Sequence, residues 1–170
     1  MKKLIVIVAI FMTFFLFGAP KNYNFMSYDL KGSFFQLKQH GEKTKAKYFV
    51  VDFFNLHCEP CKKALADWEK EYKNLKKKGV EFVLVAAPSD KQSARDEKEK
   101  VIEYFEKNRV SFPVMYDLTF YVSGLYSVSK EEKETISLQV PQVFLLDSNF
   151  QIIKKSENHL EILKEIEKFK

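Results

Sequence analysis

The only two cysteines of this 170-residue chain, Cys58 and Cys61, lie two residues apart between two apolar segments. Residues 48–54 are apolar except for Asp52, as in a buried strand, and residues 62–77 repeat apolar side chains at helical spacing. A cysteine at a helix start meets free backbone N–H groups and the positive end of the helix dipole, which stabilise its thiolate. A second cysteine one turn later can resolve a mixed disulfide formed at the first. The spacing therefore predicts thiol–disulfide exchange, with Cys58 as the nucleophile and Cys61 as the resolving thiol.

Residues 1–19 have the pattern of a targeting segment. A basic start precedes an apolar stretch over residues 4–17, which suits a signal-peptide core and is short for a membrane span of about 20 residues. The small pair Gly18-Ala19 suits a cleavage site, but the flanking Phe17 and Pro20 do not. A cleaved signal peptide and an uncleaved N-terminal membrane anchor therefore both stay open. Either one exports the remaining chain, to the periplasm or to the outer face of the cytoplasmic membrane.

The rest of the chain is predicted to form a polar connector, residues 20–24, and one domain, residues 25–170. Hydrophobic residues make up 46% of the sequence, with only 5 Gly and 5 Pro, which suits a domain with a full core. Acidic and basic residues alternate along residues 91–100 and 130–134, so we expect no nucleic-acid partner. In an exported domain of this size, a bridge across two residues adds little loop entropy. Redox chemistry therefore explains the cysteines better than a structural bridge.

Hydrophobic patterning predicts an α/β fold, with a mixed central β-sheet flanked by helices and preceded by an N-terminal β-hairpin. Trp68 is expected in the core, and Leu160, Leu163, Ile166 and Phe169 on the buried face of the last helix. The predicted elements are a hairpin over 25–37, a polar loop over 38–47, strands over 48–54 and 80–87, helices over 62–77 and 94–108, an extended piece over 110–115, a short helix over 118–126, an exposed insertion over 127–137, antiparallel strands over 138–147 and 150–154, and a helix over 159–170.

Three residues near the cysteines have predicted chemical consequences. Burial of Asp52 within its strand would raise its pKa and let it take a proton from Cys61, although a strand-end Asp facing water is the alternative. Glu59 places negative charge beside Cys58, which should keep the pKa of that thiol up and favour a reductant. Pro60 suits the first helical turn, where backbone N–H groups have no intrahelical acceptor.

Pro141 directly precedes a strong strand. A cis Val140–Pro141 bond would indicate function, and a trans proline at the strand's first residue is the alternative. His57 is expected either to raise the thiolate fraction of Cys58 or to lie exposed in a loop. Since two thiolates can bind Cu(I), a copper-handling protein that uses Cys58, Cys61 and His57 is the alternative function. Two cysteines cannot complete a tetrahedral zinc site, so we expect no resident metal and no cofactor beyond a redox-active Cys58–Cys61 disulfide.

The chain resembles the thioredoxin superfamily, and within it the exported TlpA-like branch with ResA- and CcmG-type thiol-disulfide oxidoreductases. The resemblance covers roughly residues 25–170 and implies a thioredoxin-like fold in which Pro141 is cis and faces the cysteine pair. Val140 would then pair with the substrate backbone, and we expect His57, Glu59 and Pro60 to contact substrate as well. The matching segments are Val51-Asp52-Phe53-Phe54, Cys58-Glu59-Pro60-Cys61-Lys62-Lys63, Phe112-Pro113-Val114-Met115-Tyr116-Asp117 and Val140-Pro141-Gln142-Val143-Phe144-Leu145-Leu146-Asp147.

The chain also departs from that branch at two positions. His57 stands where the family usually has Trp, and Ala64 stands where ResA-like members carry an acidic residue, whereas Asp52 matches the buried aspartate of ordinary thioredoxins. The resemblance implies an exported reductase of protein disulfides, supplied with electrons by a membrane donor of the thioredoxin-reducing type. Its expected substrates are protein thiols and disulfides, with apocytochrome c cysteines in cytochrome c maturation as the leading case. Peroxide reduction is a further alternative.

Overall fold

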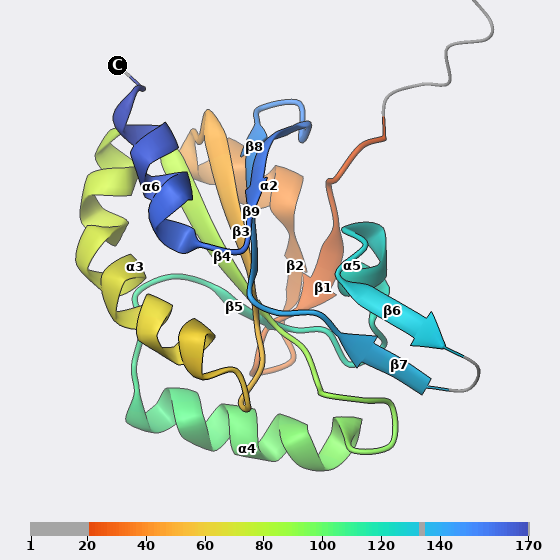
Figure 1. Cartoon of the computed structure of the whole chain (residues 1–170). Helices are drawn as coiled ribbons and strands as arrows, with labels where there is room; N and C mark the ends of the chain where they lie inside the picture. The colour runs from red at the N-terminus through yellow and green to blue at the C-terminus, as the bar shows by residue number, and fades with distance from the viewer. Residues whose placement is uncertain (1–20, 133–134, 170) are drawn as a thin grey trace, which may run out of the picture.

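The computed structural model describes residues 21–132 and 135–169, and its centre is a five-stranded sheet with the order β5-β4-β3-β8-β9 (Figure 1). Strand β3 is parallel to β4, which is parallel to β5, whereas β8 is antiparallel to both β3 and β9. The predicted mixed sheet is therefore confirmed. The strands are β3 Tyr48–Phe54, β4 Val80–Ala86, β5 Val114–Tyr116, β8 Gln142–Asp147 and β9 Ile152–Ser156.

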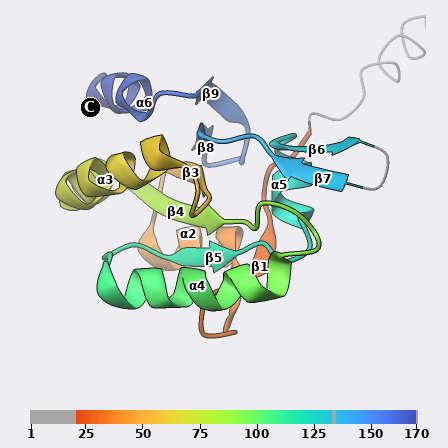
Figure 2. The same cartoon turned by 60° about the horizontal axis from the view of Figure 1, so that its bottom comes forward.

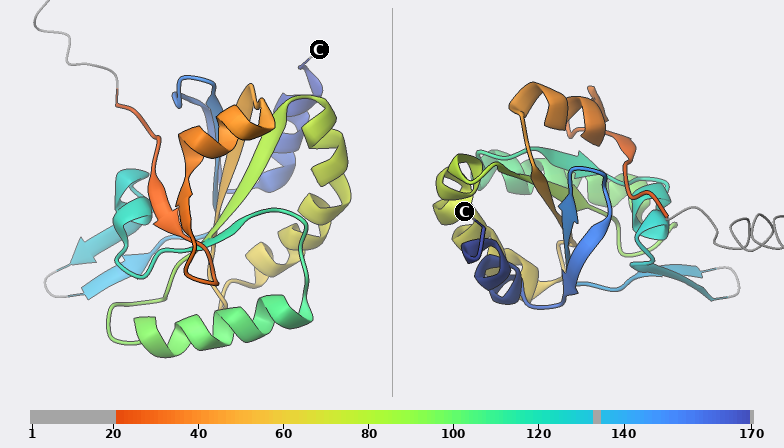
Figure 3. Two further views of the ribbon diagram at one scale, coloured as in Figure 1. Left: turned by 180° about the vertical axis from the view of Figure 1, so that it is seen from behind. Right: turned by 90° about the horizontal axis from the view of Figure 1, so that it is seen from above.

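Two hydrophobic clusters hold helices against the two faces of this sheet. The first joins the sheet to α3 Glu59–Lys77, α4 Ala94–Lys107 and α6 His159–Glu167. The second joins it to α2 Leu37–Thr44, α5 Tyr121–Leu125 and the residues around the N-terminal hairpin of β1 Met26–Tyr28 and β2 Phe34–Gln36. Figure 2 shows α4 along the β5 side of the sheet, and Figure 3 shows α2 and α6 on opposite sides of it.

Alternation along β3 determines where its one acidic side chain lies. Val50 and Phe54 belong to the cluster with α3, whereas Phe49 and Val51 belong to the cluster with α2. Because successive side chains of a strand point to opposite faces, Asp52 shares the α3 face with Val50 and Phe54. The strand therefore directs a carboxyl group towards the helix that carries Cys61.

The prediction of a polar loop over residues 38–47 is wrong, because α2 occupies most of that stretch. Its sequence carries one large apolar residue, Leu37, and only Leu37 and Gly41 are buried. A Cβ at Gly41 would lie 2.3 Å from Cζ of Phe49, so glycine lets the helix backbone rest directly on β3. Because this contact depends on the absence of a side chain, it leaves no hydrophobic pattern in the sequence.

The insertion over residues 127–137 also has more structure than predicted. It contains an antiparallel hairpin of β6 Ser129–Glu132 and β7 Thr135–Leu138. The predicted strand over 138–147 is consequently divided, since Leu138 ends β7 and β8 begins at Gln142. The two strands predicted near the end of the chain do pair antiparallel, as β8 and β9, although β9 begins two residues later than expected.

Three of the four residues predicted on the buried face of the C-terminal helix segment do pack against the core: Ile166 is buried, and Leu163 and Phe169 are partly buried. Leu160, however, is 47% exposed, and Ile162 is buried in addition. Asn158 caps the helix, because its side chain accepts a hydrogen bond from the N–H of Leu160 in the first turn. The predicted face is therefore wrong only in the first turn, at Leu160.

The predicted signal peptide or anchor, residues 1–19, lies outside the described residues. Among the residues that the structure does describe, no helix is long and apolar enough to cross a bilayer.

Candidate active site around the cysteine pair

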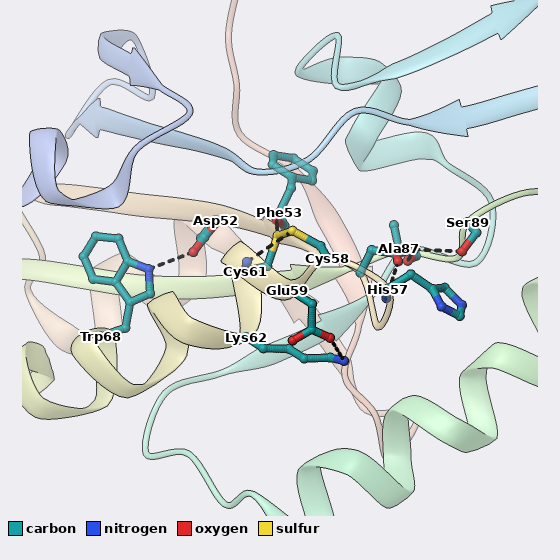
Figure 4. The surroundings of a disulfide bond; sticks show 11 residues. Asp52, Phe53, His57, Cys58, Glu59, Cys61, Lys62, Trp68, Ala87 and Ser89 are labelled. Carbon is teal, nitrogen blue, oxygen red and sulfur yellow. Dashed lines mark hydrogen bonds and ion pairs between the residues drawn. A yellow bond between two sulfur atoms is a disulfide. The ribbon is translucent and has the colours of Figure 1, made fainter.

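Cys58 is the N-cap residue of α3, which begins three residues earlier than predicted (Figure 4). Its Sγ accepts a hydrogen bond from the backbone N–H of Cys61 over 3.2 Å. Pro60 lies in the first turn, where a backbone N–H would have no intrahelical acceptor, so proline costs the helix no hydrogen bond. The first-turn N–H groups and the helix dipole therefore favour negative charge on the sulfur of Cys58.

The two cysteines form a disulfide with an S–S distance of 1.97 Å. Cys58 is the more exposed of the pair, at 7% against 3% for Cys61, whose Sγ lies 3.8 Å from the carbonyl oxygen of Phe53. An incoming sulfur therefore reaches Cys58 more readily than Cys61. This arrangement suits the predicted division between a nucleophile and a resolving thiol, and those roles stay predictions.

Asp52 is buried, as predicted, and the alternative of a strand-end Asp facing water is wrong. Its side chain is 3% exposed, and its Oδ2 accepts a hydrogen bond of 2.7 Å from Nε1 of Trp68, a core residue as expected. Burial raises the pKa of Asp52 to about 7, against the opposing effect of hydrogen bonds from Trp68 and the Phe53 backbone. A carboxyl group that titrates near neutral pH suits the predicted role of exchanging a proton with Cys61.

A cleft of about 280 Å³ brings together residues from distant parts of the sequence. Asp52 and Cys61 line it, together with Pro141, which precedes β8. The Val140–Pro141 peptide bond is cis, as the resemblance implied. The turn between β9 and α6 supplies a further wall, together with His159, the first residue of α6. Three of the predicted catalytic residues, Asp52, Cys61 and Pro141, therefore line one cavity, and the disulfide joins Cys58 to the Cys61 that lines it.

No sequence pattern indicated a role for His159. In the structure its Nε2 lies 2.8 Å from Oδ2 of Asp67, and its ring centroid lies 5.7 Å from that of Trp68. The two members of the pair are 92 positions apart in the chain, so no local motif connects them. His159 thus places an ionisable group at the edge of the cleft that contains Asp52.

Asn55 is a second residue that sequence reasoning missed. Its Nδ2 donates to the carbonyl oxygen of Ala87 at 3.3 Å and to Oγ of Ser89 at 3.1 Å, and its Oδ1 accepts from the N–H of His57 at 2.7 Å. Asn55 is only 5% exposed. In the sequence, only its place as a polar residue between an apolar strand and the cysteines could have indicated a structural role. The side chain fixes the loop before Cys58 to the loop after β4.

Asn55→Ala should lower the free energy of unfolding by about 1–3 kcal/mol, because it leaves the buried carbonyl of Ala87 and the partly buried N–H of His57 without their partner. Chemical denaturation of the oxidised protein measures the change. Ser89→Ala is the matched control, since it removes one of the three hydrogen bonds and should cost less. Equal losses in the two variants would contradict a fixing role for Asn55.

His57 and Glu59 are more exposed than the cysteines that they flank. The side chain of His57 is 74% exposed, and its Nε2 lies 3.8 Å from Oε1 of Glu97. Glu59 accepts a hydrogen bond of 2.7 Å from Nζ of Lys62, and this contact lowers the pKa of Glu59. Because Lys62 offsets its charge and water screens it, Glu59 should affect the pKa of Cys58 less than its sequence position suggests.

Within residues 21–132 and 135–169, no group of three or more His, Cys, Asp and Glu side chains is arranged to hold a metal ion. The ring of His57 lies near the carboxylate of Glu97, and its backbone N–H donates to the side chain of Asn55.

A central mixed sheet, a disulfide at a helix N-terminus and a cis-proline beside it together define a thioredoxin-like protein. The chain belongs to the AhpC/TSA family, whose model matches residues 19–155. The fold and the superfamily that the sequence predicted are thus confirmed.

Curated relatives include two proteins named thiol-disulfide oxidoreductase ResA. One, from Bacillus cereus, is 29% identical over 133 residues, 78% of this chain and 65% of the relative. The other, from Bacillus subtilis, is 28% identical over 131 residues, 77% of this chain and 62% of the relative. The chain thus spans less than two thirds of the length of these relatives.

Solved structures support the fold. StoA from Bacillus subtilis superimposes with a TM-score of 0.61 at 21% identity, over 85% of this chain and 96% of that one. Peroxidoxin BcpB from Mycobacterium tuberculosis superimposes with a TM-score of 0.70 at 14% identity, over 89% of this chain and 99% of that one.

Proposed function

We propose that this protein is a thiol–disulfide oxidoreductase that reduces disulfides of protein substrates through Cys58 and Cys61. The observation that carries the proposal is the disulfide at the N-terminus of α3, in contact with a cleft that Asp52 and Pro141 also line. The relatives named thiol-disulfide oxidoreductase support it.

The reaction begins with the reduced dithiol. The Cys58 thiolate attacks one sulfur of the substrate disulfide, so the substrate S–S bond breaks, a mixed disulfide forms and one substrate thiolate leaves. Asp52 then takes the proton of the Cys61 thiol, and the Cys61 sulfur attacks the sulfur of Cys58. The Cys58–Cys61 disulfide forms, the second substrate thiolate leaves, and two electrons have passed to the substrate. A dithiol donor restores the reduced pair by the reverse exchange.

The proposal extends to the setting of the reaction. The apolar leader supports export to the periplasm or to the outer face of the cytoplasmic membrane. There, a membrane donor of the thioredoxin-reducing type would supply electrons. Reduction of apocytochrome c cysteines before haem attachment is the use that we favour, on the resemblance to ResA- and CcmG-type proteins.

Equilibration with glutathione buffers tests the direction of electron flow. We expect a reduction potential between about −270 and −200 mV, as in reducing members of the superfamily, together with catalysis of insulin reduction. A potential near −120 mV, as in dedicated disulfide-forming enzymes, would contradict a reductant. Tight Cu(I) binding by the reduced protein with little insulin reduction would instead support the copper-handling alternative.

A further inference from the structure

The hairpin of β6 and β7 leads directly into the active site. Strand β7 ends at Leu138, and Val140 follows two residues later, immediately before the cis peptide bond to Pro141. Val140 packs against the hydrophobic cluster that contains Cys58 and Cys61. In Figure 4 the pale blue ribbon that follows β7 runs past the disulfide. A strand edge that belongs to neither cysteine segment is therefore continuous with the redox site.

The register of the hairpin shows which backbone groups of β7 face away from β6. The N–H of Gln139 donates to the carbonyl oxygen of Val128 at 2.8 Å, so Gln139 faces β6. Backbone groups of successive residues in an antiparallel strand point to opposite sides. Ile136 and Leu138, which stand opposite Glu131 and Ser129 in the register, therefore direct their N–H and carbonyl groups to the outer edge.

The outer edge of β7 has no strand beside it. In the described part of the chain β7 pairs with β6 alone, in a sheet of two strands. Over the same ranges, no backbone hydrogen bond engages Val140. An edge of this kind is a template on which another polypeptide can add as a strand. It begins at the residue beside the cis-proline and leads away from the cysteines.

We propose that the outer edge of β7 extends the substrate pairing already expected at Val140, so that it binds an extended segment of the substrate polypeptide next to the cysteine whose disulfide Cys58 attacks. This inference rests on the proposed function and specifies its substrate class, which is unfolded or extended chains rather than small thiols. From Ile136 to Val140 the edge spans about 13 Å, at roughly 3.3 Å per residue. A substrate therefore needs about four residues beside its cysteine to use the whole edge.

Ile136→Pro tests the edge, because proline removes an N–H that faces outwards and forms no bond to β6. Proline is tolerated at such positions of edge strands, so the hairpin should persist. Two probes are compared, a nine-residue peptide with a central cysteine and a tripeptide with a central cysteine, each linked to glutathione by a disulfide. For the long peptide kcat/KM should fall about three- to tenfold, the effect of one lost hydrogen bond. For the tripeptide it should not change.

Ile136→Ala is the matched control, because it shortens the same side chain and keeps the N–H; it should reduce both peptides as the parent does. An equal loss in the alanine variant, or a proline effect of the same size on both peptides, would overturn the inference. So would a dimer of the parent that Ile136→Pro dissociates, since the edge would then serve self-association. If the parent reduces neither peptide, the proposed function fails first, and the inference falls with it.

Discussion

Cys58→Ser should abolish disulfide reduction, whereas Cys61→Ser should turn substrates into stable covalent adducts. Cys58 is the more exposed sulfur and caps α3, so its thiolate is the group that an incoming disulfide meets. A serine hydroxyl is not ionised near neutral pH and does not attack a disulfide. We therefore expect turnover in an insulin assay to fall at least about a thousandfold. Without Cys61 the first step still proceeds, but no thiol releases the mixed disulfide.

Non-reducing electrophoresis and mass spectrometry of Cys61→Ser, expressed in its own host, would detect and identify these adducts. The double variant with serine at both positions is the control and should trap nothing. Apocytochrome precursors among the partners would support the favoured physiological use. If Cys61→Ser formed no adduct, thiol–disulfide exchange would be contradicted. If adducts formed equally on Cys58→Ser, the assignment of the nucleophile would be wrong.

The local part of this site could be predicted from the sequence. Strands β3 and β4 are apolar runs buried on both faces, which is the pattern of parallel strands covered by helices, and β3 has the bounds that were predicted. The placement of Cys58 at a helix start follows from the same local logic, although α3 begins at Glu59, three residues before the predicted bound. Asp52 was predicted to be buried because no other polar residue interrupts its strand.

The remaining parts depend on contacts that no local pattern encodes. Gly41 lets α2 pack against β3, because a Cβ at this position would collide with Phe49. Asn55 acts on a loop 32 positions away, and the partner of His159 is 92 positions away. These contacts exist only after the chain has folded. A single sequence therefore locates the reactive sulfurs but not the side chains that position them.

The burial of Asp52 makes the stability of the protein depend on pH. In the folded state its pKa is about 7, against 3.8 for an unperturbed Asp, because burial disfavours the charged form. Below pH 3.8 the carboxyl is protonated in both states, so it adds no ionisation cost. As pH rises towards 7 the unfolded state releases the proton and the folded state retains it, so the free energy of unfolding falls. Above that range the full cost, on the order of 4 kcal/mol, is present.

Asp52→Asn should therefore stabilise the oxidised protein by about 4 kcal/mol at pH 9, and by little at pH 3, because Asn does not ionise and can still accept from Trp68. Denaturation at pH 3, 5, 7 and 9 measures this difference. Asp96→Asn, an exposed site on α4, is the control and should show no comparable pH dependence. A constant difference between parent and Asp52→Asn would contradict a buried, costly carboxylate.

The same Asp52→Asn variant should resolve mixed disulfides at least about tenfold more slowly, since Cys61 loses its proton acceptor. The rate at which a mixed disulfide on Cys58 is released, followed in a single turnover, measures this step. Greater stability with slower resolution would show that Asp52 is retained for its chemistry, whereas greater stability with unchanged resolution would remove it from the mechanism.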